Sequence, residues 1–342
     1  MLLGSMLVRG HAVWFTGGTP HDVQKRVRKT MLLAAAQRSV PVLVAYDIPF
    51  RDGAQYSAGG VVDTAAYEAW IDGFARGIGN GKAVVILEPD GLGIIPYNTT
   101  VSGETEWCRP ALPPGMTSVQ ANQARYDQLN YAVDRLEQRP QAAVYLDGSH
   151  AAWLGADEAA HRLLKAGVER AQGFFVNVSN YQTTSDSIVF GTRVSACIAG
   201  ATGAATTHFV IDTSRNGRGP SDMSAYGRPP YKQPSTVVAA LEAGNWCNPP
   251  GAGAGLRPTA KTSVPLLDAY LWVKVPGESD GSGDVAGGAR GWDFSLYNPW
   301  NIAPASRTHF DPLWGMVDPA AGAWFPEQAL QLAQLADPPL HH

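Results

Sequence analysis

The stretch Ala83-Val-Val-Ile-Leu-Glu-Pro-Asp90 places five consecutive apolar residues directly before a segment with two acidic residues. A short, near-continuous apolar run of this kind is typical of a strand that is buried on both faces, as in a parallel sheet covered by helices. Comparable runs recur along the chain. We therefore predict seven strands, at His11–Phe15, Val42–Tyr46, Ala83–Leu87, Ala142–Leu146, Gly173–Val176, Thr207–Ile211 and Leu267–Val273.

Segments with apolar residues at helical spacing lie between these strands and predict helices at His21–Arg38, Ala65–Ile78, Gln120–Gln138 and Ala156–Lys165. The alternation of strands and helices indicates an α/β fold with a parallel sheet and helices outside it. We favour a closed barrel over an open doubly wound sheet because the first strand is not followed by a glycine-rich dinucleotide or phosphate loop.

The composition allows one large domain and excludes some partners. With 342 residues, of which 45% are hydrophobic, we expect a single domain over residues 1–342, and we find no repeat or low-complexity linker. The formal net charge of -4 supplies no cationic field for nucleic acid or for an anionic membrane surface. No apolar run approaches the ~20 residues that a membrane-spanning helix needs.

Three segments rich in glycine and proline are predicted to be long loops: Gly91–Ser118, Gly217–Thr262 and Gly281–Gly322. Loops longer than ~15 residues in a compact domain are usually functional or disordered. The three cysteines leave at least one thiol unpaired and cannot form a dense disulfide scaffold.

A polar cluster follows every predicted strand from the second onward. One Asp in such a place is more often a helix N-cap than a catalytic group. Six clusters favour an active site, because the carboxyl ends of barrel strands converge on one rim and crowded carboxylates raise one another's pKa. The clusters are Tyr46-Asp-Ile-Pro-Phe-Arg-Asp52, Glu88-Pro-Asp90, Asp147-Gly-Ser-His150, Asn177-Val-Ser-Asn-Tyr181, Asp212-Thr-Ser-Arg-Asn-Gly217 and Lys274-Val-Pro-Gly-Glu-Ser-Asp280.

A rim rich in carboxylates, in a chain with ten tryptophans, is typical of glycoside hydrolysis, where two carboxyl groups share the proton transfers and indole faces hold the sugars. Other chemistries have less support. The eight histidines include no His-x-x-x-His pair, so we expect no metal and no other cofactor. A Gly-x-Ser-x-Gly nucleophile motif is also missing.

At these positions the sequence resembles the family 6 glycoside hydrolases, the inverting cellulases that include endoglucanases and cellobiohydrolases. The resemblance covers nearly the whole chain and includes, besides the clusters above, Val13-Trp-Phe, the Ala-Ala-Trp153 that follows His150, Trp246-Cys-Asn248 and Gly322-Ala-Trp-Phe325. It implies a distorted seven-stranded parallel β/α barrel, similar to a TIM barrel, with long active-site loops. It also implies cellulose or another β-1,4-glucan as the substrate.

The resemblance implies catalytic roles for six residues. Asp90 is the expected general acid, and Asp52 is the neighbouring carboxylate that keeps the pKa of Asp90 high. For the base, Asp280 is one candidate, and proton relay through water from Asp52 with Ser57 is the other. Tyr46 is expected to press on the distorted sugar, and Asp147 to give structural and electrostatic support.

The resemblance also implies a set of substrate-binding residues. Trp14 and Trp246 are expected to stack on sugars on the non-reducing side, and Trp153 with His150 on the leaving-group side. Hydrogen bonds to the sugars are expected from Lys274, Glu278, Asn177, Asn180 and Arg51.

Two departures from the family pattern affect disulfides. The family usually has Cys where Gly53 and Ser282 stand in this chain. Cys108 and Cys247 are therefore expected to lack their usual partners, and a Cys108–Cys197 pair is left open.

The mode of attack is left open. The segment Gln55-Tyr-Ser-Ala-Gly-Gly60 resembles that of open-cleft bacterial endoglucanases and favours internal cutting, whereas Gly281–Gly322 is long enough to roof a tunnel. A non-catalytic carbohydrate-binding protein and a phosphate-handling barrel enzyme are the alternatives from other classes. We expect a secreted, extracellular monomer, although Met1–Gly10 carries no charged leader before its short apolar stretch.

Overall fold

The computed structural model describes residues 2–8, 10–54, 57–203, 206–282 and 289–340. Seven parallel strands form one sheet in the order of the sequence, which confirms the seven predicted strands with ends that differ by at most two residues. They are β1 (Val13–Phe15), β2 (Val42–Ala45), β3 (Ala83–Leu87), β4 (Ala142–Asp147), β5 (Gly173–Val176), β6 (His208–Asp212) and β7 (Leu267–Leu271).

The sheet curls so that its two edges meet, as expected for a distorted barrel. The Ala12 amide, just before β1, donates a hydrogen bond to the Trp272 carbonyl beyond β7 (2.9 Å). The Trp14 indole N–H, in β1, donates to the Val273 carbonyl (2.8 Å). Inside the curl, alternate side chains of the strands form a small core that includes Val44, Ile86 and Phe175.

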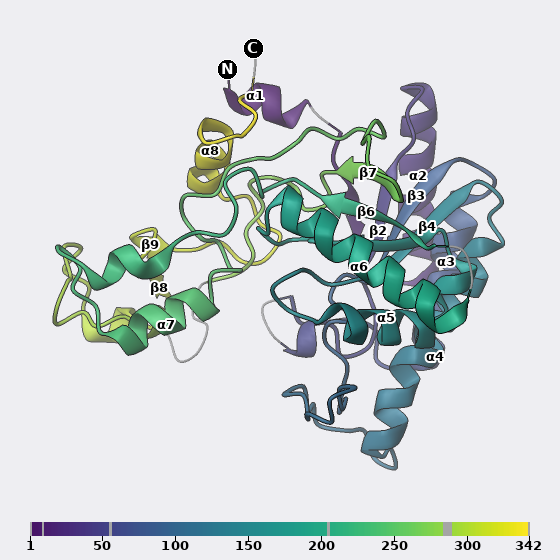
Figure 1. Ribbon diagram of the computed structural model, residues 1–342, viewed down its shortest axis with the longest axis horizontal. Helices are drawn as coiled ribbons and strands as arrows, with labels where there is room; N and C mark the ends of the chain where they lie inside the picture. Colours follow the sequence, from purple (N-terminus) through teal and green to yellow (C-terminus); the bar gives the residue numbers. More distant parts are fainter. Residues whose placement is uncertain (1, 9, 55–56, 204–205, 283–288, 341–342) are drawn as a thin grey trace.

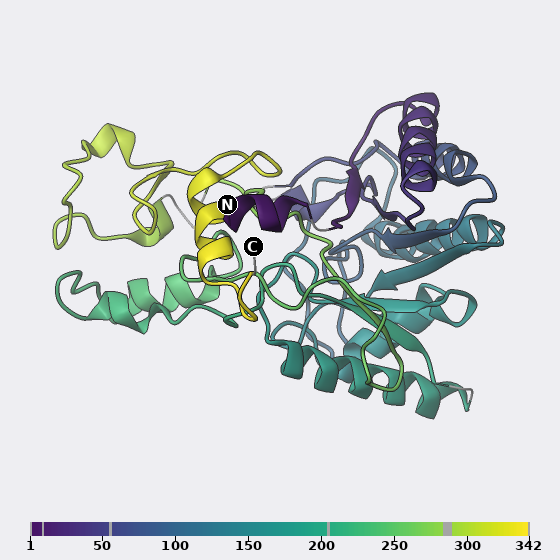
Figure 2. The ribbon, with the colours of Figure 1, turned by 90° about the horizontal axis from the view of Figure 1, so that it is seen from above.

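Five helices cover the outer face of the barrel (Figures 1 and 2): α2 (Pro20–Ala36), α3 (Thr64–Ile78), α4 (Ser118–Glu137), α5 (Ala156–Lys165) and α6 (Thr184–Thr202). The largest core cluster fills the layer between these helices and the sheet. Helix α2 begins with a capping box, in which the Thr19 and Asp22 side chains bond to each other's backbone amides and Pro20 is the first helical residue. A second capping box, between Thr117 and Gln120, begins α4. Four of the five helices were predicted. Helix α6 was missed because its many Ala, Gly, Ser and Thr residues blur the helical pattern.

A small lobe projects from one side of the barrel (Figure 1). It contains α7 (Ser235–Ala243), β8 (Phe310–Asp311) and β9 (Met316–Val317), all of which lie in segments predicted to be loops. The lobe has its own apolar cluster, in which Trp292 contacts Tyr226, Tyr231 and Trp300. Division of the chain into one domain stays a prediction.

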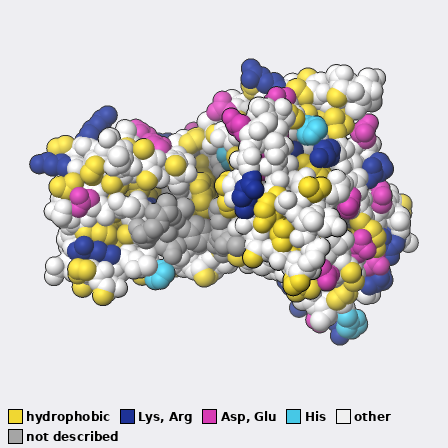
Figure 3. All heavy atoms as spheres, turned by 90° about the horizontal axis from the view of Figure 1, so that it is seen from below, with side chains coloured by type: hydrophobic (Ala, Val, Ile, Leu, Met, Phe, Trp, Pro, Cys, Tyr) yellow, Lys and Arg dark blue, Asp and Glu magenta, His cyan; other side chains and the backbone are white. Residues whose placement is uncertain are grey.

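The ends of the chain meet between barrel and lobe, where α1 (Leu2–Leu7) packs against α8 (Pro326–Gln334) (Figure 2). Within the described residues, no helix combines the length and the apolar character needed to cross a bilayer. On the face shown in Figure 3, basic and acidic side chains are interspersed, with neither sign gathered into one field.

Candidate active site

A cleft of about 830 Å³ lies over the carboxyl ends of the strands. Residues that follow each of the seven strands contribute to its walls, together with residues of the segment that leads into and out of α7. Thirteen of the fifteen predicted site residues line it: Trp14, Tyr46, Arg51, Asp52, Ser57, Asp90, His150, Trp153, Asn180, Trp246, Lys274, Glu278 and Asp280.

The other two predicted residues lie behind the wall. Asp147 is 4% exposed, and its carboxylate accepts hydrogen bonds from the amides of Leu92 and Gly93 (both 3.0 Å), so it supports the segment after β3. Asn177 is fully buried and bonds to backbone groups of Asp212 and Gln182. The expectation that Asn177 contacts substrate is therefore corrected, because its polar atoms already hold two loops together.

The segment that carries Asp90 has an unusual backbone. Glu88 (φ 51°) and Asp90 (φ 62°) both adopt the left-handed region, which costs roughly 1–3 kcal/mol for a non-glycine residue and persists only where surroundings enforce it. The Glu88 carboxylate accepts hydrogen bonds from the amides of Asp47 (3.0 Å) and Ile48 (3.2 Å). This contact ties the segment after β3 to the segment after β2, which carries Asp52.

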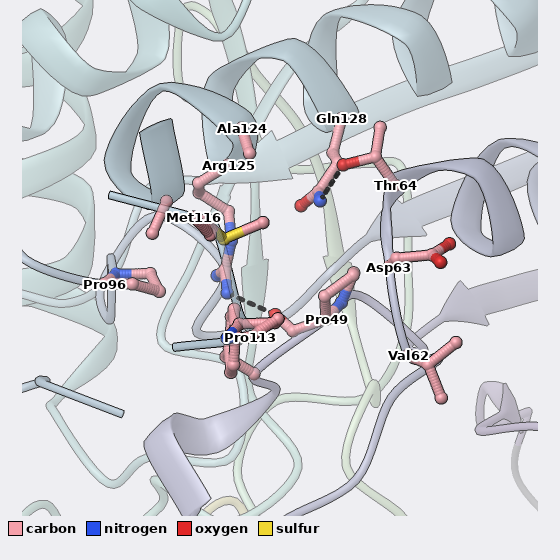
Figure 4. Close-up of a pocket in the computed structure, with 12 residues that line it drawn as sticks. Pro49, Val62, Asp63, Thr64, Pro96, Pro113, Met116, Ala124, Arg125 and Gln128 are labelled. Atoms are coloured by element: carbon pink, nitrogen blue, oxygen red, sulfur yellow. Dashed lines mark hydrogen bonds between the residues drawn. The ribbon is translucent and has the colours of Figure 1, made fainter. Parts of the chain in front are cut away.

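Arg125 of α4 holds the same two segments from outside. Its guanidinium donates to the carbonyls of Gly91 (2.7 Å), Ile94 (3.0 Å) and Pro49 (2.8 Å), and Figure 4 shows it reaching toward Pro49. The hollow around it, of about 20 Å³, has room for about one water molecule and not for a sugar. Arg125 is therefore part of the support of the site and lies outside the cleft.

Arg162 of α5 completes this support. It donates to the carbonyls of Leu92 (2.7 Å) and Gly93 (3.2 Å) and is neutralised by Glu158 and Glu106. Consecutive peptide groups after Asp90 are thus held by buried charged side chains, so this loop is fixed before substrate arrives.

Asp90 is placed to keep its proton. Burial raises its pKa well above the ordinary value, and the negative charges of Asp147, Asp52 and Asp280 raise it further, against the opposing charge of Lys274. A carboxyl group whose pKa is raised in this way keeps its proton to higher pH than an ordinary aspartate and can act as a general acid.

Asp52 differs from Asp90 in its surroundings. Burial raises its pKa to about 6, whereas a hydrogen bond from the Ser57 amide (2.8 Å) and the charge of Arg51 oppose this rise. Above that pH Asp52 is ionised and can accept a proton. Ser57 acts on it through its backbone N–H.

Asp280 is the most strongly neutralised of the three carboxylates. Burial alone would raise its pKa, but the charges of Arg215 (2.7 Å) and Lys274 (3.4 Å) lower it below the ordinary value. The Asn248 amide donates a further hydrogen bond (3.0 Å). A carboxylate held in this way is a weak base, so the electrostatics favour Asp52 as proton acceptor.

Tyr46 contacts both Trp14 and Arg51. The Trp14 and Tyr46 rings meet edge to face with their centroids 5.4 Å apart, and the Arg51 guanidinium carbon lies 4.7 Å from the centroid of the Tyr46 ring. Burial and the charges of Asp90 and Asp52 raise the pKa of its phenol well above the ordinary value. The hydroxyl therefore stays protonated. Arg51 itself donates to the carbonyls of Tyr46 and Ser57, so much of its hydrogen-bonding capacity is used within its own loop.

Burial lowers the pKa of His150 to about 4, so the ring is neutral. Its Nε2 lies 3.0 Å from the Asn180 amide nitrogen, and its ring lies 5.6 Å from that of Trp153. Trp153 covers Gly93 so closely that a Cβ there would lie 2.5 Å from the indole. A glycine is thus required beneath this tryptophan.

Lys274 and Glu278 form the polar part of the wall after β7. The Lys274 ammonium donates to the Ser279 carbonyl (3.0 Å), and burial raises the pKa of Glu278 against the nearby charge of Lys274. Both side chains also line the cleft, as predicted for groups that bind sugar hydroxyls.

Several contributors were not predicted. Trp107, Gln182, Glu242 and Asn245 line the cleft, and Arg125, Arg162 and Arg215 hold its carboxylates or loops. The only signal for Trp107 was its position in a long loop. Arg125 and Arg162 gave no signal, because their contacts form only when helices α4 and α5 pack on the loops. Arg215 belongs to the polar cluster after the sixth strand but had been given no role of its own.

The cysteines are free in the structure: Cys108 and Cys247 are buried and Cys197 is partly exposed. The open question of a Cys108–Cys197 disulfide is thus answered against it. Residues 55–56 and 283–288 lie outside the described residues, and with them parts of the two segments that bear on internal or chain-end attack. Among the residues that the structure describes, no group of His, Cys, Asp and Glu is arranged to hold a metal ion.

Comparison with known proteins gives a consistent result. The family model "Glycosyl hydrolases family 6" matches residues 4–336. Endoglucanase A of Cellulomonas fimi is 36% identical over 303 residues, which are 89% of this chain and 49% of that protein. Endoglucanase 1 of Streptomyces sp. (strain KSM-9) is 35% identical over 272 residues, 79% of this chain and 64% of the relative. The chain thus spans about half to two thirds of these curated relatives.

Among solved structures, the endoglucanase Cel6 from Mycobacterium tuberculosis, in complex with methyl-cellobiosyl-4-deoxy-4-thio-β-D-cellobioside, superposes with a TM-score of 0.71 at 34% identity. The match covers 98% of this chain and 89% of that one. A second structure, from Orpinomyces sp. Y102, gives a TM-score of 0.66 at 28% identity, with 96% and 87% covered.

Proposed function

Because the chain belongs to glycosyl hydrolase family 6, we propose that it hydrolyses β-1,4-glucosidic bonds in cellulose and related β-glucans with inversion at the anomeric carbon. The observation that carries this proposal is the pair of unlike carboxyl groups in one cleft: Asp90, whose pKa is raised well above the ordinary value, and Asp52, whose pKa of about 6 leaves it ionised at neutral pH. Two such groups are what an inverting glycosidase needs.

In the proposed reaction Asp90 donates its proton to the glycosidic oxygen as the bond to the anomeric carbon breaks. A water molecule attacks that carbon from the opposite face, and its proton passes to Asp52, directly or through a second water. The products are two shorter glucans, and the enzyme regains its starting state when the proton returns from Asp52 to Asp90 through solvent. Asp280 remains ionised throughout and contributes negative charge near the developing oxocarbenium ion.

Substrate binding follows from the walls of the cleft. Trp14, Trp246 and Trp153 offer indole faces to the apolar C–H faces of glucosyl units. Lys274, Glu278, His150 and Asn180 offer polar groups to the sugar hydroxyls.

We favour internal cutting. The bacterial relatives at 35–37% identity are named endoglucanases, whereas the fungal relatives named cellobiohydrolase C, three of them labelled probable, are 28–30% identical. We also propose a secreted protein, because an insoluble polymer cannot enter a cell. A monomer is proposed because residues of this single chain line the cleft from every strand.

Product analysis tests the proposal. With cello-oligosaccharides we expect new reducing ends in the α configuration, followed by NMR before mutarotation, and with carboxymethyl cellulose a steep early fall in viscosity. Products in the β configuration would contradict inversion. Near-exclusive cellobiose would contradict internal cutting. Binding of glucan without turnover would favour a carbohydrate-binding protein instead.

A further inference from the structure

We propose that Trp107 is an additional glucan-binding platform of the cleft, seated directly on the loop that carries Asp52. This inference rests on the proposed function, because it assumes a β-glucan in the cleft. It adds a contact residue to the site, supplied by the long loop between β3 and α4.

The flanking residues of Trp107 turn its side chain outward. Glu106 on one side forms an ion pair with the buried Arg162, and its amide donates to the Asn98 carbonyl (3.1 Å). Cys108 on the other side is buried, and its carbonyl accepts from the Tyr97 amide (2.9 Å). With both neighbours anchored to the protein, the indole of Trp107 is 55% exposed and lines the cleft.

The inner part of the ring rests on a glycine beside a catalytic carboxylate. A Cβ at Gly53 would lie 2.6 Å from Trp107 Cη2 and 3.1 Å from the Cγ2 of Ile94, so any larger residue there would push the ring away. Gly53 follows Asp52 directly and has a φ of 55°. The position of the indole is therefore fixed by the same loop that positions Asp52.

Trp153 shows the same construction on the neighbouring loop. It covers Gly93, three residues after Asp90, and is 38% exposed. Ile94, the residue after Gly93, lies against Gly53 and also lines the cleft, so it links the glycine beneath Trp153 to the glycine beneath Trp107. Trp107 and Trp153 are both partly exposed and line the same cleft, and two such indoles fit the apolar C–H faces of successive glucosyl units. An isolated indole at the surface would have no such neighbour.

The chain offers a matched control in Trp324. This residue is 41% exposed and also covers a glycine, since a Cβ at Gly277 would lie 2.6 Å from its ring. It does not belong to the residues that line the cleft. Trp324 therefore resembles Trp107 in being partly exposed and in packing on a glycine, but it differs in not lining the cleft.

Oxidation by N-bromosuccinimide, read residue by residue by peptide mass spectrometry, compares the tryptophans in one molecule. We would use the Asp90→Asn variant so that cellohexaose is bound and not consumed. We expect cellohexaose to slow oxidation of Trp107 and Trp153 by about fivefold or more and to leave Trp324 unchanged. Protection of Trp153 without protection of Trp107 would overturn this inference alone. Protection of neither would overturn it together with the proposed function.

Kinetics supply the second measurement. We expect Trp107→Ala to raise KM for cellohexaose about tenfold and to change kcat less than about threefold, with Trp107→Phe in between and Trp324→Ala like the wild type. A fall in kcat with unchanged KM would overturn the inference, because it would mark Trp107 as a mere support of the Asp52 loop.

Discussion

Asp90 is held in the left-handed backbone region, which few non-glycine residues adopt, at a place where burial and three carboxylates raise its pKa. Both features cost stability, and neither serves packing. They are understandable if the residue must present a proton at a fixed point, which is the demand that general acid catalysis makes. At the scale of one residue, the strain and the raised pKa point to the same role.

The charge on Asp52 is one cause of the raised pKa of Asp90, so its removal has a predictable sign. In the proposed mechanism catalysis needs protonated Asp90, so we expect activity to be lost as the pH rises through the pKa of that group. Asp52→Asn deletes a negative charge and lowers this pKa, so the alkaline limb of the kcat/KM profile should move to lower pH, by about one unit. The rate at the optimum should also fall, by about 10²–10⁴-fold, because a proton acceptor is lost.

The matched control is Asp127→Asn on α4, which removes an exposed carboxylate that does not line the cleft. It should leave both limbs unchanged. An alkaline limb that stays in place in Asp52→Asn would show that Asp52 does not act on the titrating acid.

The residues that line the cleft could largely be predicted from sequence, because motifs after strands place them. The residues that position them could not. Glu88 belongs to the Glu-Pro-Asp cluster, but its role could not be predicted. Its contact with the backbone amides of Asp47 and Ile48 depends on how the neighbouring loop folds. Asn177 was assigned to substrate because a polar residue after a strand looks the same whether it faces the cleft or the protein.

At the scale of elements, helix α4 does more than cover the sheet, because through Arg125 it joins the loops of Asp52 and Asp90. Arg125→Met leaves three buried carbonyls without their donor. We expect a loss of about 2–4 kcal/mol in the free energy of unfolding, measured with urea, and a fall in kcat of more than about tenfold. Arg125→Lys should not restore activity, since one ammonium group cannot reproduce the planar fork that reaches both loops.

Arg76→Met on α3 is the control, because Arg76 pairs with Asp72 at 3.4 Å near the surface, where the two side chains are 44% and 29% exposed. Its unfolding free energy should change by less than about 1 kcal/mol. Wild-type kcat in Arg125→Lys would contradict a positioning role for the guanidinium.

Elements differ in how readily they are predicted. The strands were found because burial on both faces leaves an uninterrupted apolar signal, as in Ala83–Leu87. Helix α7 was missed within a segment rich in glycine and proline, since its nine residues bury a single side chain fully, that of Leu241. Short helices on a lobe of this kind lack the wide apolar stripe by which helices are recognised.

At the scale of the whole molecule, the barrel supplies the carboxyl groups of the cleft, and helix α7 and the segment after it complete the cleft with Glu242, Asn245 and Trp246. Basic and acidic side chains are interspersed on the face shown in Figure 3, and the formal net charge is -4. Both observations fit a neutral polymer as the partner. The closure of the barrel between β1 and β7 brings Trp14 to the same rim as Lys274. The parts of the chain that meet in the cleft are separated by more than 200 residues.

The most direct test of proton donation by Asp90 compares two substrates in the Asp90→Ala variant. Cellotetraose needs its leaving oxygen to be protonated, whereas 2,4-dinitrophenyl β-cellobioside releases a phenol acidic enough to leave without a proton. We expect kcat/KM to fall by about 10³-fold or more on cellotetraose and by less than about tenfold on the dinitrophenyl substrate. Equal losses on both substrates, or full activity on cellotetraose, would contradict the assignment of Asp90 as the general acid.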